Sequence, residues 1–400
     1  MTNNKDKKVL NVPTLRFPEF NGEWEKCKLS KVCSFFSGGT PPSSNKEYYN
    51  GNIPFIRSGE LHNDETELFI TKEGLDNSAA KMVEVGDLLL ALYGATSGNI
   101  AISKIKGAIN QAILCIRTKQ NKKFVESVWN KHVARLLQTY LQGGQGNLSA
   151  DIVKNIPFYF TNIEEQNKLA RFISLLDQRI AAQNKIIEKY ESLIQAICET
   201  LIESEQYKVE LSFNDFGKPY SGLSGKSAED FGNGWPYITY MNVYQNQIID
   251  ITDVGLVKIN ETEQQSVVRY GDILFTLSSE TPDEVGMGAV YLGDAYPLYL
   301  NSFCFGVHIT DESKIFPPFL AYYISTKSFR KAVFPLAQGS TRFNLQKNDF
   351  MKKIFHFPTV KKQSEIYSVL KAYSDKLSVE KNIVNLLCEQ KSYLLRQLFI

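Results

Sequence analysis

The sequence predicts an α+β protein in which two similar mixed α/β globules are separated by two long helices. Three observations support this: two unbroken heptad patterns, a 197-residue spacing between them, and the same order of strand signals ahead of each. We expect the helices to pack as an antiparallel coiled coil, with pseudo-two-fold symmetry. The expected globules span residues 1–163 and 206–361, and the expected helices span residues 164–205 and 362–400.

The first globule contains a series of turn and strand signals. Glycine-containing turns introduce apolar segments at residues 51–56 and 85–90, as expected for short buried strands. Another apolar strand is expected over residues 107–117, followed by a basic helical stretch over residues 124–141. A glycine-bearing loop then leads to an Asn-Leu pair at residues 147–148.

The second globule repeats these signals in the same order. The corresponding turns and strands lie at residues 234–238, 270–275 and 299–308, and the basic helical stretch lies at residues 318–334. The Asn-Leu pair recurs at residues 344–345, 197 positions after the first. We therefore expect one fold to occur twice, with loops of different length.

Each long helix is predicted from apolar positions that alternate in steps of four and three, which is typical of a coiled-coil seam. The polar position Gln183 of the first seam recurs as Glu380 in the second, and a polar residue in a seam commonly fixes the register. Two unrelated surface helices are the alternative interpretation. The seam positions are Leu169, Ile173, Leu176, Ile180, Gln183, Ile187, Tyr190, Ile194, Ile197 and Leu201, and Ile366, Leu370, Tyr373, Leu377, Glu380, Val384, Leu387, Lys391, Leu394 and Leu398.

Charge is segregated along the chain although the net charge is only +2. Residues 314–362 carry ten basic residues and one acid, and residues 117–157 carry seven and two. Residues 245–284 carry eight acids and two bases. Such segregation favours strongly positive faces suited to nucleic acid, whereas ordinary solvated helix surface is the alternative.

Composition indicates a folded protein, because 43% of the residues are hydrophobic and 12% are aromatic. The six cysteines form no Cys-x-x-Cys pair, and the lysine-rich start does not resemble a signal peptide. No apolar run approaches the ~18 residues of a membrane helix. We expect a cytoplasmic protein with reduced thiols and no membrane partner.

Several motifs resemble the specificity subunit of a type I restriction-modification system. They are Pro-Thr-Leu-Arg-Phe-Pro-Glu-Phe at residues 13–20 with Trp24 and Leu29, Ser-Gly-Gly-Thr-Pro at 37–41, the Gly-Asp strands, and the Glu-Glu-Gln and Lys-Lys-Gln helix starts. The resemblance covers essentially the whole chain. One departure is Ser-Gly-Leu-Ser-Gly-Lys at residues 221–226, where the second globule lacks the Gly-Gly-Thr-Pro pattern.

This resemblance implies two target-recognition domains, each of which reads one half of a split sequence in double-stranded DNA. It also implies that the long helices set the spacer between the halves and dock two methyltransferase subunits. Motor-nuclease subunits would join through the complex. The chain itself would be non-catalytic and would carry no cofactor and no metal.

Candidate DNA-binding residues are polar or glycine residues in loops at strand ends, where side chains can reach base edges and phosphates. In the first globule they are Gly38, Gly39, Thr40, Arg57, Ser58, Glu60, Tyr93, Thr96, Ser97, Gln142, Gln145 and Asn147. In the second globule they are Thr239, Tyr240, Asn242, Ser278, Ser279, Glu280, Gln338, Ser340, Thr341, Arg342 and Asn344.

Two other function classes remain as alternatives. Pro282-Asp283 with Glu312-Ser313-Lys314 matches a metal-dependent nuclease pattern, although both pieces are expected in loops. A coiled-coil scaffold with protein-binding globules is the other. Under the scaffold alternative, charge reversal at Arg342 and Lys347 would leave DNA activity unchanged.

Overall fold

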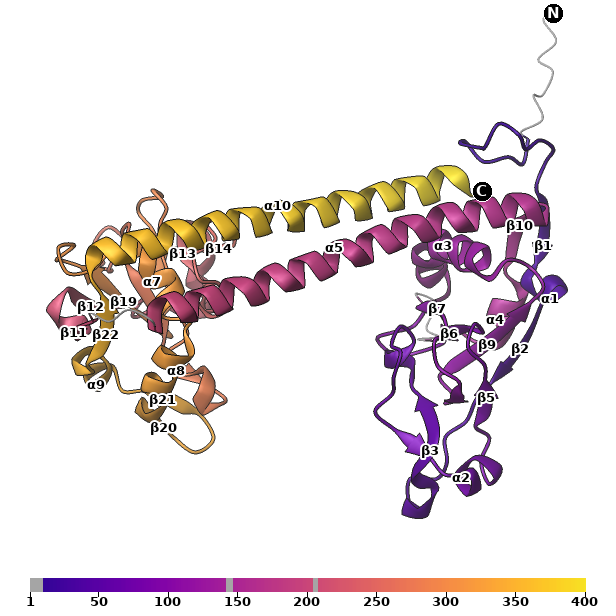
Figure 1. Cartoon of the computed structure of the whole chain (residues 1–400), viewed down its shortest axis with the longest axis horizontal. Coiled ribbons are helices and arrows are strands. Elements are labelled where there is room, and N and C mark those ends of the chain that lie inside the picture. Colours follow the sequence, from indigo (N-terminus) through magenta and orange to yellow (C-terminus); the bar gives the residue numbers. More distant parts are fainter. Residues whose placement is uncertain (1–9, 142–146, 204–207) are drawn as a thin grey trace, which may run out of the picture. The chain divides into compact units, whose positions relative to one another are not determined.

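The computed structural model describes residues 10–141, 147–203 and 208–400 (Figure 1). Its internal contacts divide the chain into two compact units. Unit 1 comprises residues 1–184 and 382–400, and unit 2 comprises residues 185–381. Across the described residues, no helix combines the length and apolar character needed to cross a membrane.

Unit 1 is built on two four-stranded sheets. The first is antiparallel with the order β2-β9-β6-β7, formed by β2 (Cys33–Ser37), β6 (Leu88–Ala91), β7 (Ile100–Ile102) and β9 (Ile113–Thr118). The second has the order β4-β3-β8-β5, formed by β3 (Tyr49–Ile56), β4 (Phe69–Ile70), β5 (Lys81–Val83) and β8 (Gly107–Ile109). In this sheet β3 and β8 run parallel.

The other elements of unit 1 cover and connect these sheets. Strands β1 (Glu25–Lys28) and β10 (Pro157–Phe160) form an antiparallel pair. Helix α3 packs against β7, and the Trp129 indole N–H donates to the Gly98 carbonyl at 2.8 Å. The helices are α1 (Leu29–Val32), η1 (Lys46–Tyr48), η2 (Ser58–Glu60), α2 (Lys72–Asp76), α3 (Lys122–Leu141) and α4 (Ala150–Asn155).

Unit 2 repeats this plan. Its antiparallel sheet has the order β12-β19-β15-β17, formed by β12 (Gly217–Ser221), β15 (Ile273–Thr276), β17 (Gly288–Val290) and β19 (Cys304–Ile309). A second sheet, β14-β13-β18, contains the parallel pair β13 (Phe231–Ile238) and β18 (Tyr299–Leu300) next to β14 (Val254–Val257). Strands β11 (Lys208–Leu211) and β22 (Phe355–Pro358) pair as β1 and β10 do. The repeated fold predicted from the strand signals is confirmed.

One sheet of unit 2 has no counterpart among the described parts of unit 1. A small sheet, β16-β21-β20, joins β16 (Ser278–Ser279), β20 (Ala337–Gln338) and β21 (Phe343–Leu345). The helices of the globular part of unit 2 are η3 (Phe213–Asp215), η4 (Ala228–Asp230), α6 (Tyr240–Gln245), η5 (Pro282–Glu284), α7 (Pro317–Tyr323), α8 (Lys327–Val333), η6 (Phe334–Leu336) and α9 (Lys347–Lys352).

The segment predicted as a helical stretch, residues 318–334, is helical but not continuous. Two short helices, α7 and α8, occupy this segment. The break falls at Thr326, whose backbone is extended and whose hydroxyl accepts from the Phe329 amide at 3.2 Å. A threonine that caps the next helix in this way ends the preceding one.

The two long helices are α5 (Ile163–Glu203) and α10 (Val360–Leu398). In unit 1, Leu169 near the start of α5 shares a core with Leu398 at the end of α10. In unit 2, Ile202 near the end of α5 shares a core with Ile366 near the start of α10. The helices therefore pack antiparallel, as predicted, and every predicted seam position is at least partly buried.

A fully buried glutamine fixes the start of each long helix. The Gln166 side-chain amide donates to the Thr161 carbonyl at 2.7 Å, and its oxygen accepts from the Asn121 amide at 3.1 Å. Gln363 makes the equivalent bonds, to the Pro358 carbonyl and from the Phe316 amide, both at 2.8 Å. The Gln of the two helix-start motifs thus ties each long helix to its own globule.

Candidate functional site

In both units the fold brings together two loops that lie far apart in the sequence. In unit 1 the Leu148 amide donates to the Leu92 carbonyl at 2.9 Å, and in unit 2 the Leu345 amide donates to the Leu277 carbonyl at 2.8 Å. The first loop of each pair follows a strand of the antiparallel sheet, β6 in unit 1 and β15 in unit 2. The second is the end of the glycine-bearing segment. Predicted site residues from the two loops therefore gather at equivalent places in the two units.

In unit 2 these loops line an open groove. The small sheet places Ser278 opposite Asn344, and Gln338 on the other side of Asn344. Six of the predicted residues line the groove, and Met241, Tyr244 and Glu284 complete it. The six are Tyr240, Ser278, Ser279, Glu280, Thr341 and Arg342. Four predicted residues of the glycine-bearing segment lie exposed beside one another, namely Gln338, Ser340, Thr341 and Asn344.

Two tyrosines of α6 form one wall of this groove. The rings of Tyr240 and Tyr244 stack with centroids 6.0 Å apart and an interplanar angle of 17°. The Tyr240 hydroxyl donates to the Ser278 carbonyl at 2.7 Å, and the Tyr244 hydroxyl donates to Glu284 Oε1 at 2.7 Å. This bond from Tyr244 is the main reason that the pKa of Glu284 lies below its ordinary value, and it raises the pKa of Tyr244.

Arg342 is the cation of the groove. Its guanidinium lies over the ring of Phe303, 5.6 Å from the centroid, and 54% of Phe303 is exposed. None of the described acids forms an ion pair with Arg342, so its donors are available to a ligand. A guanidinium suits the two acceptors of a guanine or the oxygens of a phosphate.

Thr239 and Asn242 have structural roles, in contrast to their prediction as DNA-reading residues. The Thr239 hydroxyl caps α6 by accepting from the Asn242 amide at 3.1 Å. Asn242 is fully buried, and its side chain bonds the Asp250 carbonyl at 2.7 Å, the Asp253 carbonyl at 2.6 Å and the Asp250 amide at 3.0 Å. An amide so fully bonded has nothing left to offer a base.

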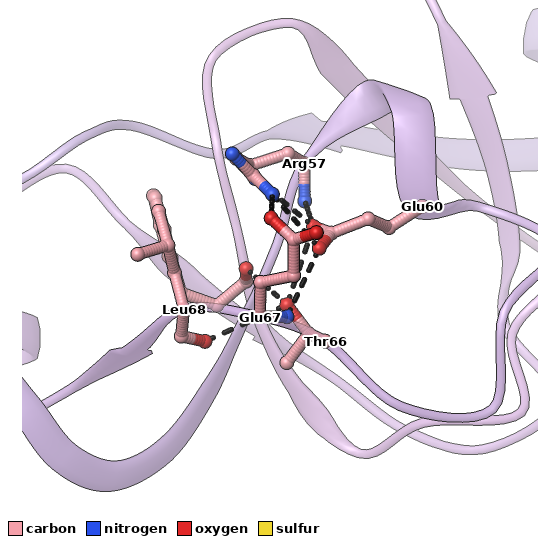
Figure 2. Close-up of polar contacts among 6 residues, drawn as sticks. Arg57, Glu60, Thr66, Glu67 and Leu68 are labelled. Atoms are coloured by element: carbon pink, nitrogen blue, oxygen red, sulfur yellow. Dashed lines mark hydrogen bonds and ion pairs between the residues drawn. The ribbon is translucent and has the colours of Figure 1, made fainter. Parts of the chain in front are cut away.

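Glu60 and Arg57 of unit 1 likewise bond to each other and to the chain (Figure 2). Arg57 Nη2 lies 3.1 Å from Glu60 and 2.5 Å from Glu67. Glu60 also accepts from the Glu67 amide at 3.1 Å and the Thr66 hydroxyl at 3.2 Å. The prediction of Glu60 as a base-reading residue is not supported by this geometry, because its side chain is only 8% exposed and its carboxylate already accepts from several donors, whereas 40% of the Arg57 side chain is exposed.

The pKa of Glu60 shows how these bonds outweigh burial. Burial alone raises the pKa of this carboxyl group, but the Arg57 side chain and the backbone amides of Arg57 and Glu67 lower it to about 2. Glu60 in turn raises the pKa of Arg57. Ser58, which lies between them, is half-buried.

The predicted phosphate-binding glycines are required by packing. A Cβ on Gly38 would lie 1.9 Å from the Ile109 carbonyl oxygen, and one on Gly39 would lie 2.5 Å from the Ala79 Cβ. In unit 2 a Cβ on Gly222 would lie 2.0 Å from the Asn301 carbonyl oxygen. Gly222 therefore occupies the place of Gly38, although the Gly-Gly-Thr-Pro pattern is missing. The Thr40 hydroxyl donates to the Gln111 side chain.

The remaining predicted residues of unit 1 lie along the paired loops. The Ser97 hydroxyl donates to the Leu92 carbonyl at 3.0 Å, Thr96 is half-buried, and burial raises the pKa of Tyr93. Asn147 is exposed beside this loop. Gln142 and Gln145 lie outside the described residues.

Sequence reasoning missed Met241, Tyr244, Glu284 and Phe303. One signal for the tyrosine existed, since Tyr244 follows Tyr240 by four residues and therefore shares its helix face. Met241 follows Tyr240 directly in α6, and Glu284 and Phe303 lie in segments without a periodic pattern. The nuclease alternative has no support in the geometry, because Asp283 lies in η5 and Glu312 in a turn. Among the described residues, no group of three or more His, Cys, Asp or Glu side chains is placed to hold a metal.

Two copies of one α+β fold, each joined to a long coiled-coil helix and each bearing paired recognition loops, define a duplicated binding protein. The chain belongs to the family described as the type I restriction modification DNA specificity domain, whose pattern matches residues 21–192 and again residues 221–388. The resemblance found in the sequence is thus confirmed. The chain is a non-catalytic DNA-specificity component with two target-recognition domains.

Relatives of similar length have the same assignment. The chain is 21% identical to the type I restriction enzyme MjaVIII specificity subunit of Methanocaldococcus jannaschii, over 94% of this chain and 91% of that one. It is 26% identical to the HindI specificity subunit of Haemophilus influenzae, over 32% of this chain and 29% of that one.

Two solved structures share the fold. One is the type I restriction-modification S subunit from M. genitalium, with a TM-score of 0.54 and 16% identity over 97% of this chain and 99% of that one. The other comes from a study of complex assembly and conformational transition in the type I system. Its TM-score is 0.59 with 15% identity, over 93% of this chain and 96% of that one.

Proposed function

We propose that each unit reads one half of a bipartite target in double-stranded DNA. In this proposal α5 and α10 set the spacer between the halves and dock two methyltransferase subunits, and motor-nuclease subunits join through the complex. The chain needs no cofactor or metal of its own. The observation that carries the proposal is the recurrence of the same loop pairing, Leu148 to Leu92 and Leu345 to Leu277, in two units of one fold.

The groove of unit 2 has the chemistry that this role requires. Base edges are read by side chains with fixed donors and acceptors, and phosphates are held by cations and hydroxyls. Arg342 supplies the planar donor, exposed Gln338 and Asn344 supply amides, and Ser340 and Thr341 supply hydroxyls. Segregated basic charge along residues 314–362 supports the electrostatic part of binding.

Mapping of methylated positions tests the proposal. The full chain is co-expressed with a matching methyltransferase subunit, and all modified positions in the host DNA are determined. We expect a single split sequence with a constant spacer. Modification without sequence preference, or of a continuous site, would contradict the proposal.

An arginine variant tests the groove within this assay. We expect Arg342→Gln to reduce binding to the target by roughly 5- to 150-fold, since a good bidentate contact is worth about 1–3 kcal/mol. Arg269→Gln is the matched control, because Arg269 is an exposed arginine of unit 2 that does not line the groove. Equal binding by both variants would place the contact elsewhere and would favour the scaffold alternative.

A further inference from the structure

Glu284 is an acid in a surface that the proposed function presents to DNA, a polyanion. A carboxylate there repels phosphates and weakens binding to every sequence unless a base compensates for it. Such a residue serves discrimination, because a site that offers it a donor is favoured over all sites that do not. We infer that Glu284 is a specificity-determining residue that accepts a hydrogen bond from the amino group of a cytosine. This inference rests on the proposed function.

The carboxylate of Glu284 is held in place by hydroxyl groups. Tyr244 donates to Oε1 at 2.7 Å, and Ser279 donates to Oε2 at 3.1 Å. The Thr281 hydroxyl also stabilises the ionised form. A carboxylate has about four acceptor positions. The two hydrogen bonds from Tyr244 and Ser279 therefore orient the carboxylate and leave acceptor positions for a ligand.

The hydrogen-bond partners of Glu284 differ from those of Glu60, an acid with a structural role. Glu60 is bonded to an arginine and to backbone amides, and its side chain is only 8% exposed. Glu284 has no ion-pair partner among the described residues, is half-buried and lines the groove. Neutral hydroxyls orient the charge of Glu284 without neutralising it.

A second feature of the groove independently points to a ligand. Ser278 lines the same groove and is 5% exposed, and its side-chain oxygen has no hydrogen-bond partner among the described residues. Buried hydroxyls are nearly always satisfied, so an orphaned one in the wall of a groove favours a bound partner there. A ligand with polar atoms on the Glu284 side of the groove would supply that partner.

The identity of the base follows from the donors and acceptors in the groove. An ionised carboxylate can only accept, and in the major groove cytosine presents its N4 amino group as a donor. Arg342 in the same groove complements guanine, which presents only acceptors there. A fixed acceptor together with an available arginine thus matches a C·G pair better than an A·T pair, since adenine adds an acceptor beside its amino group.

The test uses the full chain with its methyltransferase partner and the same mapping of modified sequences. Glu284→Gln replaces the acceptor with a group of equal shape that can also donate. We expect discrimination to fall by roughly 10- to 100-fold at one C·G position, in the half-site read by unit 2 only, because one lost base contact has about this effect. Glu312→Gln is the control, since Glu312 is an exposed acid of unit 2 outside the groove.

Tyr244→Phe keeps the acid and removes one of its orienting hydroxyls. We expect it to weaken discrimination at the same position by a smaller factor, which separates recognition from any folding defect of the Glu284 variant. An unchanged target sequence for Glu284→Gln, equal relaxation in both half-sites, or relaxation at an A·T position would overturn the inference. Failure of the proposed function looks different, because the wild-type chain would then direct modification to no defined sequence.

Discussion

At the scale of single residues, the two units use glutamates in opposite ways. Glu60 of unit 1 is enclosed by an arginine and by amide groups, whereas Glu284 of unit 2 is oriented by hydroxyls at the edge of a groove. Burial and bonding partners, not residue type, decide which acid supports the fold and which can meet a ligand.

Because the pKa of Glu60 is lowered, the stability of unit 1 depends on pH in the acid range. The folded pKa of about 2 lies below the ordinary value of 4.5, so the stabilisation is fully present above pH 4.5 and is lost as the pH falls toward 2. We expect the loss of stability between pH 7 and pH 3 to be smaller in Glu60→Gln than in the wild-type chain. Urea unfolding at the two pH values measures this.

Glu65→Gln is the control for the acid test, because Glu65 is an exposed acid a few residues away. If Glu60→Gln and Glu65→Gln have the same pH profile, the Arg57–Glu60 contact does not stabilise the fold. The base-reading role predicted from the sequence would then be open again.

Gly38, in the Ser-Gly-Gly-Thr-Pro segment of unit 1, provides a second prediction. Gly38→Ala should destabilise unit 1 by several kcal/mol, because the new Cβ would overlap the Ile109 carbonyl and the backbone would have to move. Gly59→Ala is the control, since no atom lies within 4 Å of its Cβ position. Thermal unfolding compares the two. A Gly38→Ala variant of normal stability but reduced DNA affinity would instead support the phosphate-binding role.

The candidate site could be predicted from the sequence only as a set of loops. Polar type and position after a strand selected Ser278, Thr341 and Arg342, which the fold places in one groove. The same criteria also selected Asn242, whose burial depends on carbonyls eight and eleven residues further along the chain. Tertiary partners decide whether a polar side chain is occupied, and one sequence does not contain that information.

At the scale of elements, the long helices were the most predictable part of the chain. A heptad pattern depends on local spacing alone, so the seams of α5 and α10 followed from it, whereas their antiparallel direction was expected from the duplicated order of globule and helix. The basic stretch of unit 2 was less predictable, because a helix break at Thr326 depends on one capping bond. Loop insertions between the strands change the number of residues that separates equivalent positions in the two units, so strands cannot be matched by one constant offset.

The attachment of α10 to unit 1 depends in part on one aspartate of α5. Asp177 lies 2.7 Å from Lys123 of α3 and 2.5 Å from Lys391 of α10, and these lysines outweigh burial and lower its pKa. We expect Asp177→Asn to destabilise this part of unit 1 by about 1–3 kcal/mol, because Lys391 loses this counter-ion and Lys123 keeps only Glu126 among the described residues.

Hydrogen exchange of the C-terminal half of α10 measures this effect. Glu188→Gln on the same helix is the control, because Glu188 is exposed. Equal protection in both variants would show that apolar packing alone holds this half of the helix against unit 1.

At the scale of the whole molecule, the proposed function makes the long helices a ruler. Removing residues 183–189 and 380–386 deletes one heptad from each helix and keeps both seams in phase. Seven residues correspond to about 10 Å of helix, or roughly three base-pair steps of ~3.4 Å. We expect the accepted spacer to shorten by about that amount or activity to disappear. Full activity with the original spacer would refute the ruler.

The division into units has a consequence for inheritance. Unit 2 is one continuous run of residues 185–381, and both of its ends lie inside long helices. These ends are one repeat length apart. A crossover at each end would therefore replace the whole of unit 2 and would leave the heptad pattern of both long helices intact. Such a cassette can be exchanged between related genes by recombination within the helix-coding segments. Under the proposed function, a hybrid made with these junctions is expected to fold and to recognise one half-site of each parent.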